Sequence, residues 1–231
     1  MENDVAAEPW GLHRQEQEHA CQLAVEGLYS SDDEATKLAA IQQVRELCLP
    51  QHPFCVQNRA QIGELGGIDM LAALLDSRSD DVQRQSCLAL NEACLKNTAN
   101  SNQLCHCGAI GSIMDILRSG NSDLQTQALA VLGTSAVNSL EVRFALRDCG
   151  AINQLVRLLG AKTTSVQEWA AYALRKACSR SNNRQVRFSV LTEQPRVEPD
   201  VAGSNRQQSL IIFTCRVSFQ WLVCSSAAWC M

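Results

Sequence analysis

The sequence lacks an excess of basic residues, a secretory leader and an acylation signal. Twenty Lys and Arg against 24 Asp and Glu give a formal net charge of -4, which is not the basic footprint that neutralises nucleic-acid phosphates. Residues 1–20 contain no basic stretch followed by an apolar one, and Glu2 stands where N-myristoylation requires Gly. These absences argue against nucleic-acid binding, secretion and N-terminal acylation.

The sequence also lacks the motifs of common catalytic and phosphate-binding sites. Its four histidines form no H-E-x-x-H pair, and no Ser or Cys has the flanking residues of a nucleophile elbow. The stretch GELGG (63–67) lacks the Gly-Lys-Ser/Thr end of a phosphate loop. We therefore expect no enzymatic activity and no cofactor.

Cysteines, in contrast, are abundant, but their spacing is irregular. The chain has 12 of them, and five fall at apolar positions of the repeat described below: Cys87, Cys94, Cys107, Cys149 and Cys178. We interpret them as reduced, small, buried side chains of a cytoplasmic or nuclear protein, against the weaker alternative of a disulfide framework. A metal site at residues 105–107 with Cys149 is disfavoured, because Cys107 and Cys149 share one repeat position with Leu65 and so predict a shared packing role.

A repeat of 42 residues organises the middle of the chain. Gly66-Gly67-Ile68 returns as Gly108-Ala109-Ile110 and again as Gly150-Ala151-Ile152. The same spacing aligns five further positions: Leu71, Ile113 and Leu155; Leu75, Leu117 and Leu159; Val82, Leu124 and Val166; Gln83, Gln125 and Gln167; Leu90, Leu132 and Leu174. Six positions in agreement indicate a repeat architecture.

Each unit is predicted to contain three helices. In the first unit, apolar or small residues recur at three-and-four spacing, which predicts helices at about 58–65, 67–76 and 81–95. Gly66 is expected to break the first helix from the second, since a residue without a Cβ tolerates a sharp bend. Ser79, Asp80 and Asp81 are expected to cap the amino end of the third helix.

The repeat strongly resembles the armadillo repeat, and residues 150–174 give the closest copy. The resemblance covers about 58–188 and implies an all-α fold: a right-handed α-α superhelix of about three full repeats plus a degenerate N-terminal one, with an irregular C-terminal tail. We predict a disordered N-terminus at 1–15, an array over 16–188 with repeats at about 16–48, 58–96, 100–138 and 142–180 and a partial one at 182–188, and a linker and tail at 189–231.

The C-terminal residues leave other interpretations open. Thr192 stands where the repeat calls for Gly, so the chain is expected to resemble a fragment of a longer array with an uncovered end. Residues 210–231 are apolar, but Arg216 and Gln220 near their middle argue against a membrane-spanning helix. A membrane-tethered adaptor, anchored through this tail or through acylated cysteines, remains an alternative of a different class.

The third helices are expected to line a concave surface. Ser86, Leu90 and Ala93 point into the core, so the opposite side of each helix faces this surface. The predicted partner-binding residues are Gln85, Leu88 and Glu92 in the first unit, Gln127, Ala130 and Thr134 in the second, and Trp169, Tyr172 and Lys176 in the third.

Each of these residues also has a plainer interpretation. The polar ones can be ordinary solvated positions, and Lys176 either pairs with an acidic peptide or is solvated at the rim. Trp169 and Tyr172 are of the type enriched at interface hot spots, although packing against a further repeat accounts for them equally well.

The family comparison narrows the expected partner. Importin-alpha-like armadillo proteins hold basic nuclear-localisation peptides with a Trp and an Asn four residues apart on successive third helices. The matching pairs here are Leu88 and Glu92, Ala130 and Thr134, and Tyr172 and Lys176, so a nuclear-import receptor is disfavoured. A beta-catenin-like or vacuolar-protein-8-like scaffold, binding an extended or helical segment of another protein without catalysis, is the leading hypothesis.

Overall fold

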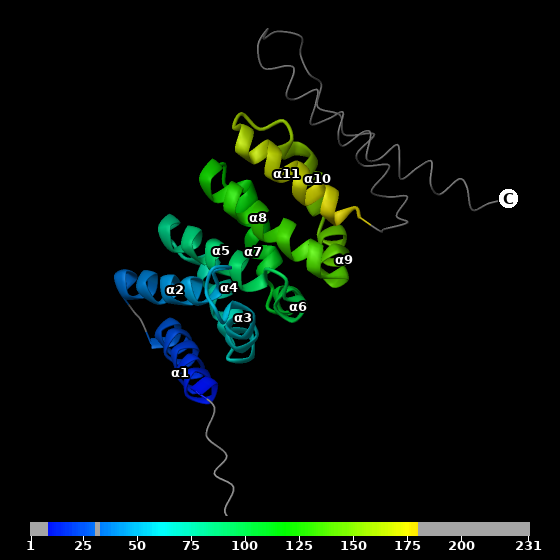
Figure 1. Ribbon diagram of the computed structural model, residues 1–231. Coiled ribbons are helices and arrows are strands. Elements are labelled where there is room, and N and C mark those ends of the chain that lie inside the picture. The colour runs from blue at the N-terminus through cyan, green and yellow to red at the C-terminus, as the bar shows by residue number, and fades with distance from the viewer. Residues whose placement is uncertain (1–8, 31–32, 180–231) are drawn as a thin grey trace, which may run out of the picture.

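The computed structural model describes residues 9–30 and 33–179, and every regular element within these ranges is a helix. The elements are α1 (Pro9–Ser30), α2 (Glu34–Cys48), α3 (Cys55–Glu64), α4 (Gly67–Ala73), the short 3-10 helix η1 (Leu74–Asp76), α5 (Asp80–Cys94), α6 (Thr98–His106), α7 (Ala109–Arg118), α8 (Ser122–Asn138), α9 (Leu140–Asp148), α10 (Ala151–Leu158) and α11 (Thr164–Ala177). Figure 1 follows them from the blue α1 to the yellow α11.

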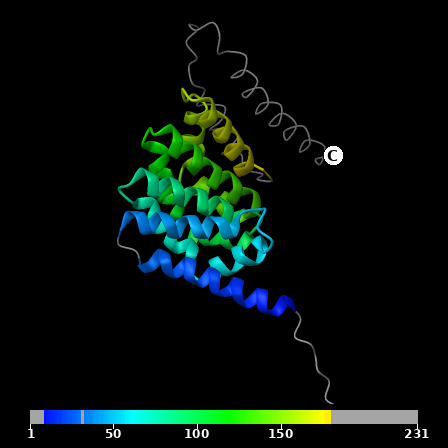
Figure 2. The same ribbon diagram turned by 60° about the vertical axis from the view of Figure 1, so that its left-hand side comes forward.

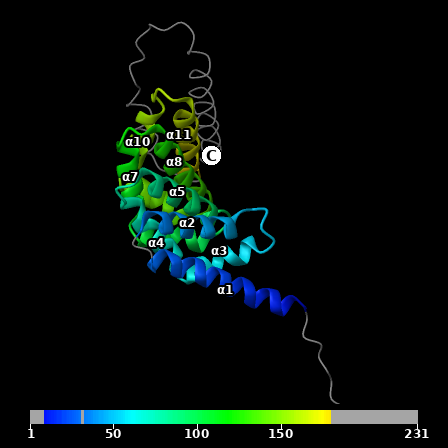
Figure 3. The same cartoon turned by 90° about the vertical axis from the view of Figure 1, so that its left-hand side faces the viewer.

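The helices form a solenoid of stacked units. The pair α1 and α2 comes first, and the triplets α3 to α5, α6 to α8 and α9 to α11 follow. The third helices α2, α5, α8 and α11 pack side by side as one row, and the first helices α3, α6 and α9 form a second row. Figures 2 and 3 show the third-helix row from two further directions. The all-α solenoid expected from the sequence is confirmed.

Three glycines bend the chain between the first and second helix of each triplet. Gly66, Gly108 and Gly150 have φ values of 80°, 78° and 74°, in the left-handed region that glycine adopts without strain. Each one precedes the first residue of α4, α7 or α10. The predicted breaks are therefore confirmed, and they follow from a local property of the backbone.

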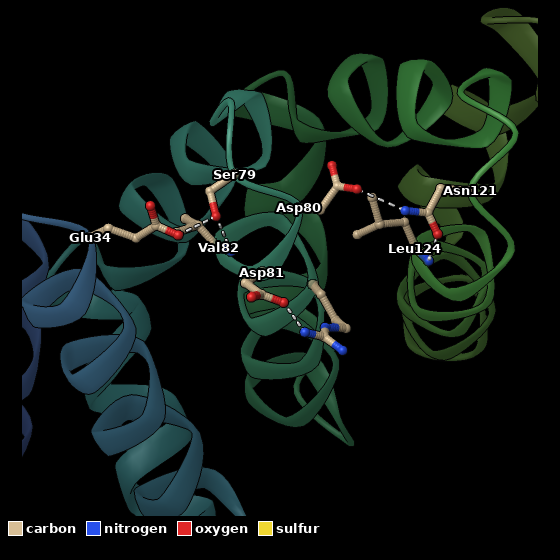
Figure 4. A network of polar contacts seen from close by, with 8 residues as sticks. Glu34, Ser79, Asp80, Asp81, Val82, Asn121 and Leu124 are labelled. Atoms are coloured by element: carbon tan, nitrogen blue, oxygen red, sulfur yellow. Dashed lines mark hydrogen bonds and ion pairs between the residues drawn. The ribbon is translucent and has the colours of Figure 1, made fainter.

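Polar side chains cap α5 and α8 and tie the amino ends of α2, α5 and α8 together (Figure 4). Ser79 Oγ accepts a hydrogen bond from the backbone N–H of Val82, which confirms the predicted cap of α5. The Ser79 hydroxyl also donates to Glu34 on α2. One repeat further on, Asn121 caps α8 and its Nδ2 donates to Asp80 Oδ2 at 2.9 Å. These N-terminal caps therefore do two things. They satisfy the first backbone N–H groups of α5 and α8, and they link α2, α5 and α8 to one another.

A column of glutamines holds each third helix to the end of the helix before it. The Nε2 groups of Gln83, Gln125 and Gln167 donate to the backbone oxygens of Ser77, Leu117 and Ala161 at 2.9, 3.0 and 2.6 Å, in that order. The repeated Gln in the sequence is explained by this bond, because the carbonyls at a helix end otherwise lack partners.

Two arginines 84 residues apart fasten the first helices to the third helices. Arg59, which is 4% exposed, donates to the backbone oxygens of Cys48 and of Leu95. Arg143 donates in the same way to the oxygens of Ala136, Val137 and Ser179. Each guanidinium therefore spans the carboxyl ends of two successive third helices, where its charge complements the helix dipoles.

The structure differs from the expected boundaries in two places. The single helix expected over 67–76 is α4 followed by η1, because the last turn tightens before the extended residue Ser77. Residues 9–15, placed in a disordered N-terminus, begin α1, a continuous helix of 22 residues that packs on α2, α3 and α4. The partial repeat at 182–188 and the tail at 189–231 lie outside the described residues.

Candidate functional site

The predicted binding residues lie on the row of third helices, on a surface that we call the third-helix face. It consists of the nine residues predicted above, on α5, α8 and α11, together with Asn91, Gly133 and Arg175, which precede Glu92, Thr134 and Lys176 by one residue each. The packing of α5 on α8 and of α8 on α11 makes this face continuous across three units.

Eight of the nine predicted residues are partly exposed. Ala130 is the exception, being 6% exposed, because its methyl group is too short to reach solvent from the packed row of helices. The face is therefore interrupted at α8 by a shallow position flanked by larger side chains on α5 and α11. Ala130 is an unsuitable contact for a partner side chain of any length.

Hydrogen bonds connect α5 and α8 along the face. Thr134 Oγ1 donates to Asn91 Oδ1 at 2.7 Å, and Asn91 Nδ2 lies 3.5 Å from Glu92 Oε1. The second carboxylate oxygen of Glu92 is buried and has no hydrogen-bond partner. Thr134 is thus engaged within the fold, and one carboxylate oxygen of Glu92 is enclosed without a hydrogen-bond partner.

Packing of an aromatic ring on a glycine connects α8 and α11. A Cβ placed on Gly133 would lie 2.5 Å from Cδ1 and 2.6 Å from Cε1 of Tyr172, so the tyrosine ring rests directly on the backbone of α8. Trp169 meets Tyr172 edge to face, with the ring centroids 5.5 Å apart. The absence of a side chain at Gly133 is therefore what allows Tyr172 to lie flat against the neighbouring helix.

Two cations lie over the same tyrosine ring. The Cζ atom of Arg175 is 5.4 Å from the Tyr172 ring centroid, and the Nζ atom of Lys176 is 5.3 Å from it. Both distances are within the range of cation–π attraction. The structure thus brings together four residues at this end of the face. They are Trp169, Tyr172, Arg175 and Lys176, and we call them the basic aromatic cluster.

Asn91, Gly133 and Arg175 were missed from the sequence. They occupy one repeat position, at which Asn91 and Gly133 each contact the next third helix, and the prediction placed only the following residue on the face. Gly133 carried a signal, since a lone glycine inside a helical pattern usually has a packing reason. Asn91 carried none, because its partner Thr134 lies 43 residues away along the chain, whereas Arg175 lies three residues after Tyr172, a helical spacing that could have placed it beside the ring.

Of the five repeat cysteines expected to be buried, Cys87, Cys94 and Cys178 are buried, whereas Cys107 is half-buried and Cys149 is exposed, so the prediction is wrong for these two. Cys107 and Cys149 contact the backbone oxygens of Leu104 and Leu146, three residues upstream of each, at 3.8 and 3.6 Å. None of the nine cysteines in the described ranges forms a disulfide, and no group of His, Cys, Asp and Glu there has the arrangement of a metal site. Burial raises the pKa of Cys48, Cys87 and Cys94 to about 12. These thiols stay protonated at neutral pH.

One cavity of about 340 Å³ lies between α1 and α2, away from the third-helix face. Its lining is Ala20, Leu23, Ala24, Gln43, Glu46, Leu47 and His52. None of the predicted binding residues contributes to it.

In the described ranges no helix is both long enough and apolar enough to cross a membrane.

Comparison with known proteins identifies the repeat. The family model of the armadillo/beta-catenin-like repeat matches residues 55–94 and 140–179, which are the first and third triplets. No curated protein sequence matches the chain.

Three solved structures are similar in fold. A designed armadillo repeat protein in complex with the peptide (KR)4 is 16% identical, with a TM-score of 0.72, and the match covers 93% of this chain and 95% of that one. Computationally designed armadillo repeat proteins for modular peptide recognition give 20% identity, a TM-score of 0.63, and 74% and 69% coverage. An engineered protein gives 26% identity, a TM-score of 0.65, and 74% and 68% coverage.

Proposed function

Because the chain belongs to the armadillo/beta-catenin-like repeat family, we propose that it is a non-catalytic scaffold that holds a segment of a partner protein against its third-helix face. The observation that carries the proposal is the continuity of this face, on which half-exposed polar and aromatic side chains repeat over α5, α8 and α11. Repeats stacked in this way provide an extended binding surface. The similar designed proteins support the proposal, since their descriptions name a bound peptide and peptide recognition.

The proposal includes the absence of catalysis and a cytoplasmic location. Support for the first is the chemistry of the face, whose side chains are mainly amide, aliphatic, aromatic and basic, with Glu92 as the one carboxylate among its residues. Support for the second is that none of the nine described cysteines forms a disulfide, which suits a reducing compartment. Partner identity is left to experiment.

Photo-crosslinking from a partly exposed position on the face and an exposed position off it tests the proposal. In one variant, benzoylphenylalanine replaces Gln127 on the third-helix face of α8. In a matched variant it replaces Asp115 on α7, the second helix of the same triplet, which lies outside that face. We expect partner peptides to be crosslinked from position 127 and not from position 115, with both variants showing the helical circular dichroism of the wild type. Crosslinking that is equal at both positions, or stronger at position 115, contradicts the proposal.

A further inference from the structure

The carboxyl end of α11 carries two positive charges, and within the described residues neither α8 nor α11 places a carboxylate at that end. The only charged residue of α8 is Asp123, in its first turn, and the only acidic residue of α11 is Glu168, in its first half. Arg175 and Lys176 occupy the last turn of α11, and neither forms an ion pair within the described residues. The two acidic residues of the neighbouring helix α9 are already engaged, since Glu141 bonds His106 and Asp148 bonds Arg147.

The helix dipole accounts for only part of this arrangement. Basic residues in a last helical turn interact favourably with the exposed carbonyls there. In this unit, however, Arg143 already donates to the carbonyls of Ala136, Val137 and Ser179 at those ends. Arg175 and Lys176 instead lie over the Tyr172 ring, which holds both cations at one place on the surface. Cations held in place lose less side-chain freedom when an anion binds.

We propose that the basic aromatic cluster binds an acidic segment of the partner, with carboxylates on Arg175 and Lys176 and a neighbouring apolar side chain against Trp169. This inference rests on the proposed function and names the chemistry that the α8 to α11 end of the face selects. The charge complementarity favours a peptide over a nucleic acid, because two cations on a chain of net charge -4 neutralise few phosphates. The cluster has the same sign of charge as the peptide (KR)4 held by the similar designed protein, so it does not suit a basic peptide of that kind.

The test measures binding of two labelled peptides to the full chain by fluorescence anisotropy. One alternates Asp and Leu and has the length of (KR)4, and the other alternates Lys and Leu. Their equal apolar content isolates charge. We expect the acidic peptide to bind at least about tenfold more tightly at low salt, and its affinity to fall as salt is raised. Equal affinities for the acidic and the basic peptide overturn the acidic preference but leave a peptide-binding face. No binding of the acidic peptide overturns this inference only, because the crosslinking experiment tests the proposed function separately.

Charge variants locate the site. Lys176→Glu is expected to weaken the acidic peptide about tenfold, and Arg175→Gln about threefold, because the first replaces attraction by repulsion and the second only removes attraction. Arg157→Glu, an equal charge change on the exposed side of α10, is the control and is expected to change affinity less than about twofold. Thermal unfolding of each variant separates lost binding from lost folding, and a folded Lys176→Glu protein with wild-type affinity overturns the assignment.

A single-stranded oligonucleotide carrying the same number of charges as the acidic peptide completes the experiment. We expect it to bind more weakly than the peptide, since the cluster offers an indole face and two cations but no extended basic track. If the oligonucleotide binds as tightly as the acidic peptide, and Lys176→Glu abolishes binding of both, the cluster is a general anion site and the peptide assignment is overturned.

Discussion

The two junctions on either side of α8 use the same repeat position in different ways. Between α5 and α8 the contacts are polar: Thr134 donates to Asn91, and Asn138 donates to the backbone oxygen of Cys94 at 2.8 Å. Between α8 and α11 the same position is Gly133, and an aromatic ring replaces the hydrogen bond. The stack therefore needs helices that fit at a given spacing, and it accepts either hydrogen bonding or ring packing to achieve that fit.

The caps show the same contrast. Asn121 bonds Asp80 and so links α8 to α5, as Figure 4 shows. Thr163 occupies the equivalent position before α11, but its side chain makes no capping hydrogen bond. The α8 to α11 junction thus depends on apolar and cation–π contacts, and we expect it to be the more sensitive to added volume and the less sensitive to loss of a single hydroxyl.

Adding volume at the glycine is expected to have the largest effect. In Gly133→Ala the new Cβ would overlap the Tyr172 ring, and we expect the free energy of unfolding to fall by about 1–2 kcal/mol in urea titration. Gly111→Ala on α7 is the matched control, since its added Cβ meets nothing within 4 Å, and helix propensity alone is expected to raise stability by about 0.5–1 kcal/mol. If both variants gain stability, the ring contact does not determine this junction.

Alkaline pH is expected to lower the free energy of unfolding through Cys94, a buried thiol in the last turn of α5. The pKa of Cys94 is raised by burial from 9.0 to about 12, so this thiol contributes stability below pH 9 and loses it as pH rises toward 12. Between pH 8 and pH 10 the loss from this one group is about 1.4 kcal/mol. Cys94→Ala should therefore show a shallower decrease in the free energy of unfolding over this interval. Parallel pH profiles for the variant and the wild type would show that Cys94 is accessible to solvent in the native state.

Removing the hydroxyl at the polar junction is expected to have the smallest effect. Thr134→Val leaves Asn91 Oδ1 without its donor, at a cost of about 0.5–1.5 kcal/mol. Thr134→Ser keeps the donor and should retain most of the stability, and in the double variant Asn91→Leu with Thr134→Val the two changes should cost less than their sum. Additive losses, measured by urea unfolding, would contradict direct coupling across this junction.

Much of the fold was predictable because its signals act over a few residues. Gly66, Gly108 and Gly150 mark bends that need a left-handed backbone, and Ser79 caps the helix that begins at the next residue. The glutamine column was also visible, but its bond to the end of the preceding helix was not. The start of α1 at Pro9 was missed, since its first turns have no repeat counterpart to compare with.

The candidate site was less accessible to prediction. Spacing alone placed Trp169, Tyr172 and Lys176 on one side of α11, and the structure places them there. It also shows that Ala130 is buried and that Arg175 joins the cluster by lying over the same ring as Lys176. Both depend on how deeply neighbouring helices approach and on side-chain rotamers, which periodicity does not report.

The repeat length, the three helices of a unit and their approximate ends follow from the residues alone, because bends and caps are local consequences of backbone chemistry. What joins the units across the third-helix face becomes visible when the helices are packed together. Thr134 meets Asn91 and Tyr172 meets Gly133 from 43 and 39 residues away, and which atoms touch at such a junction depends on the distance and angle between packed helices. The physical reason is that these contacts exist only once the helices are stacked.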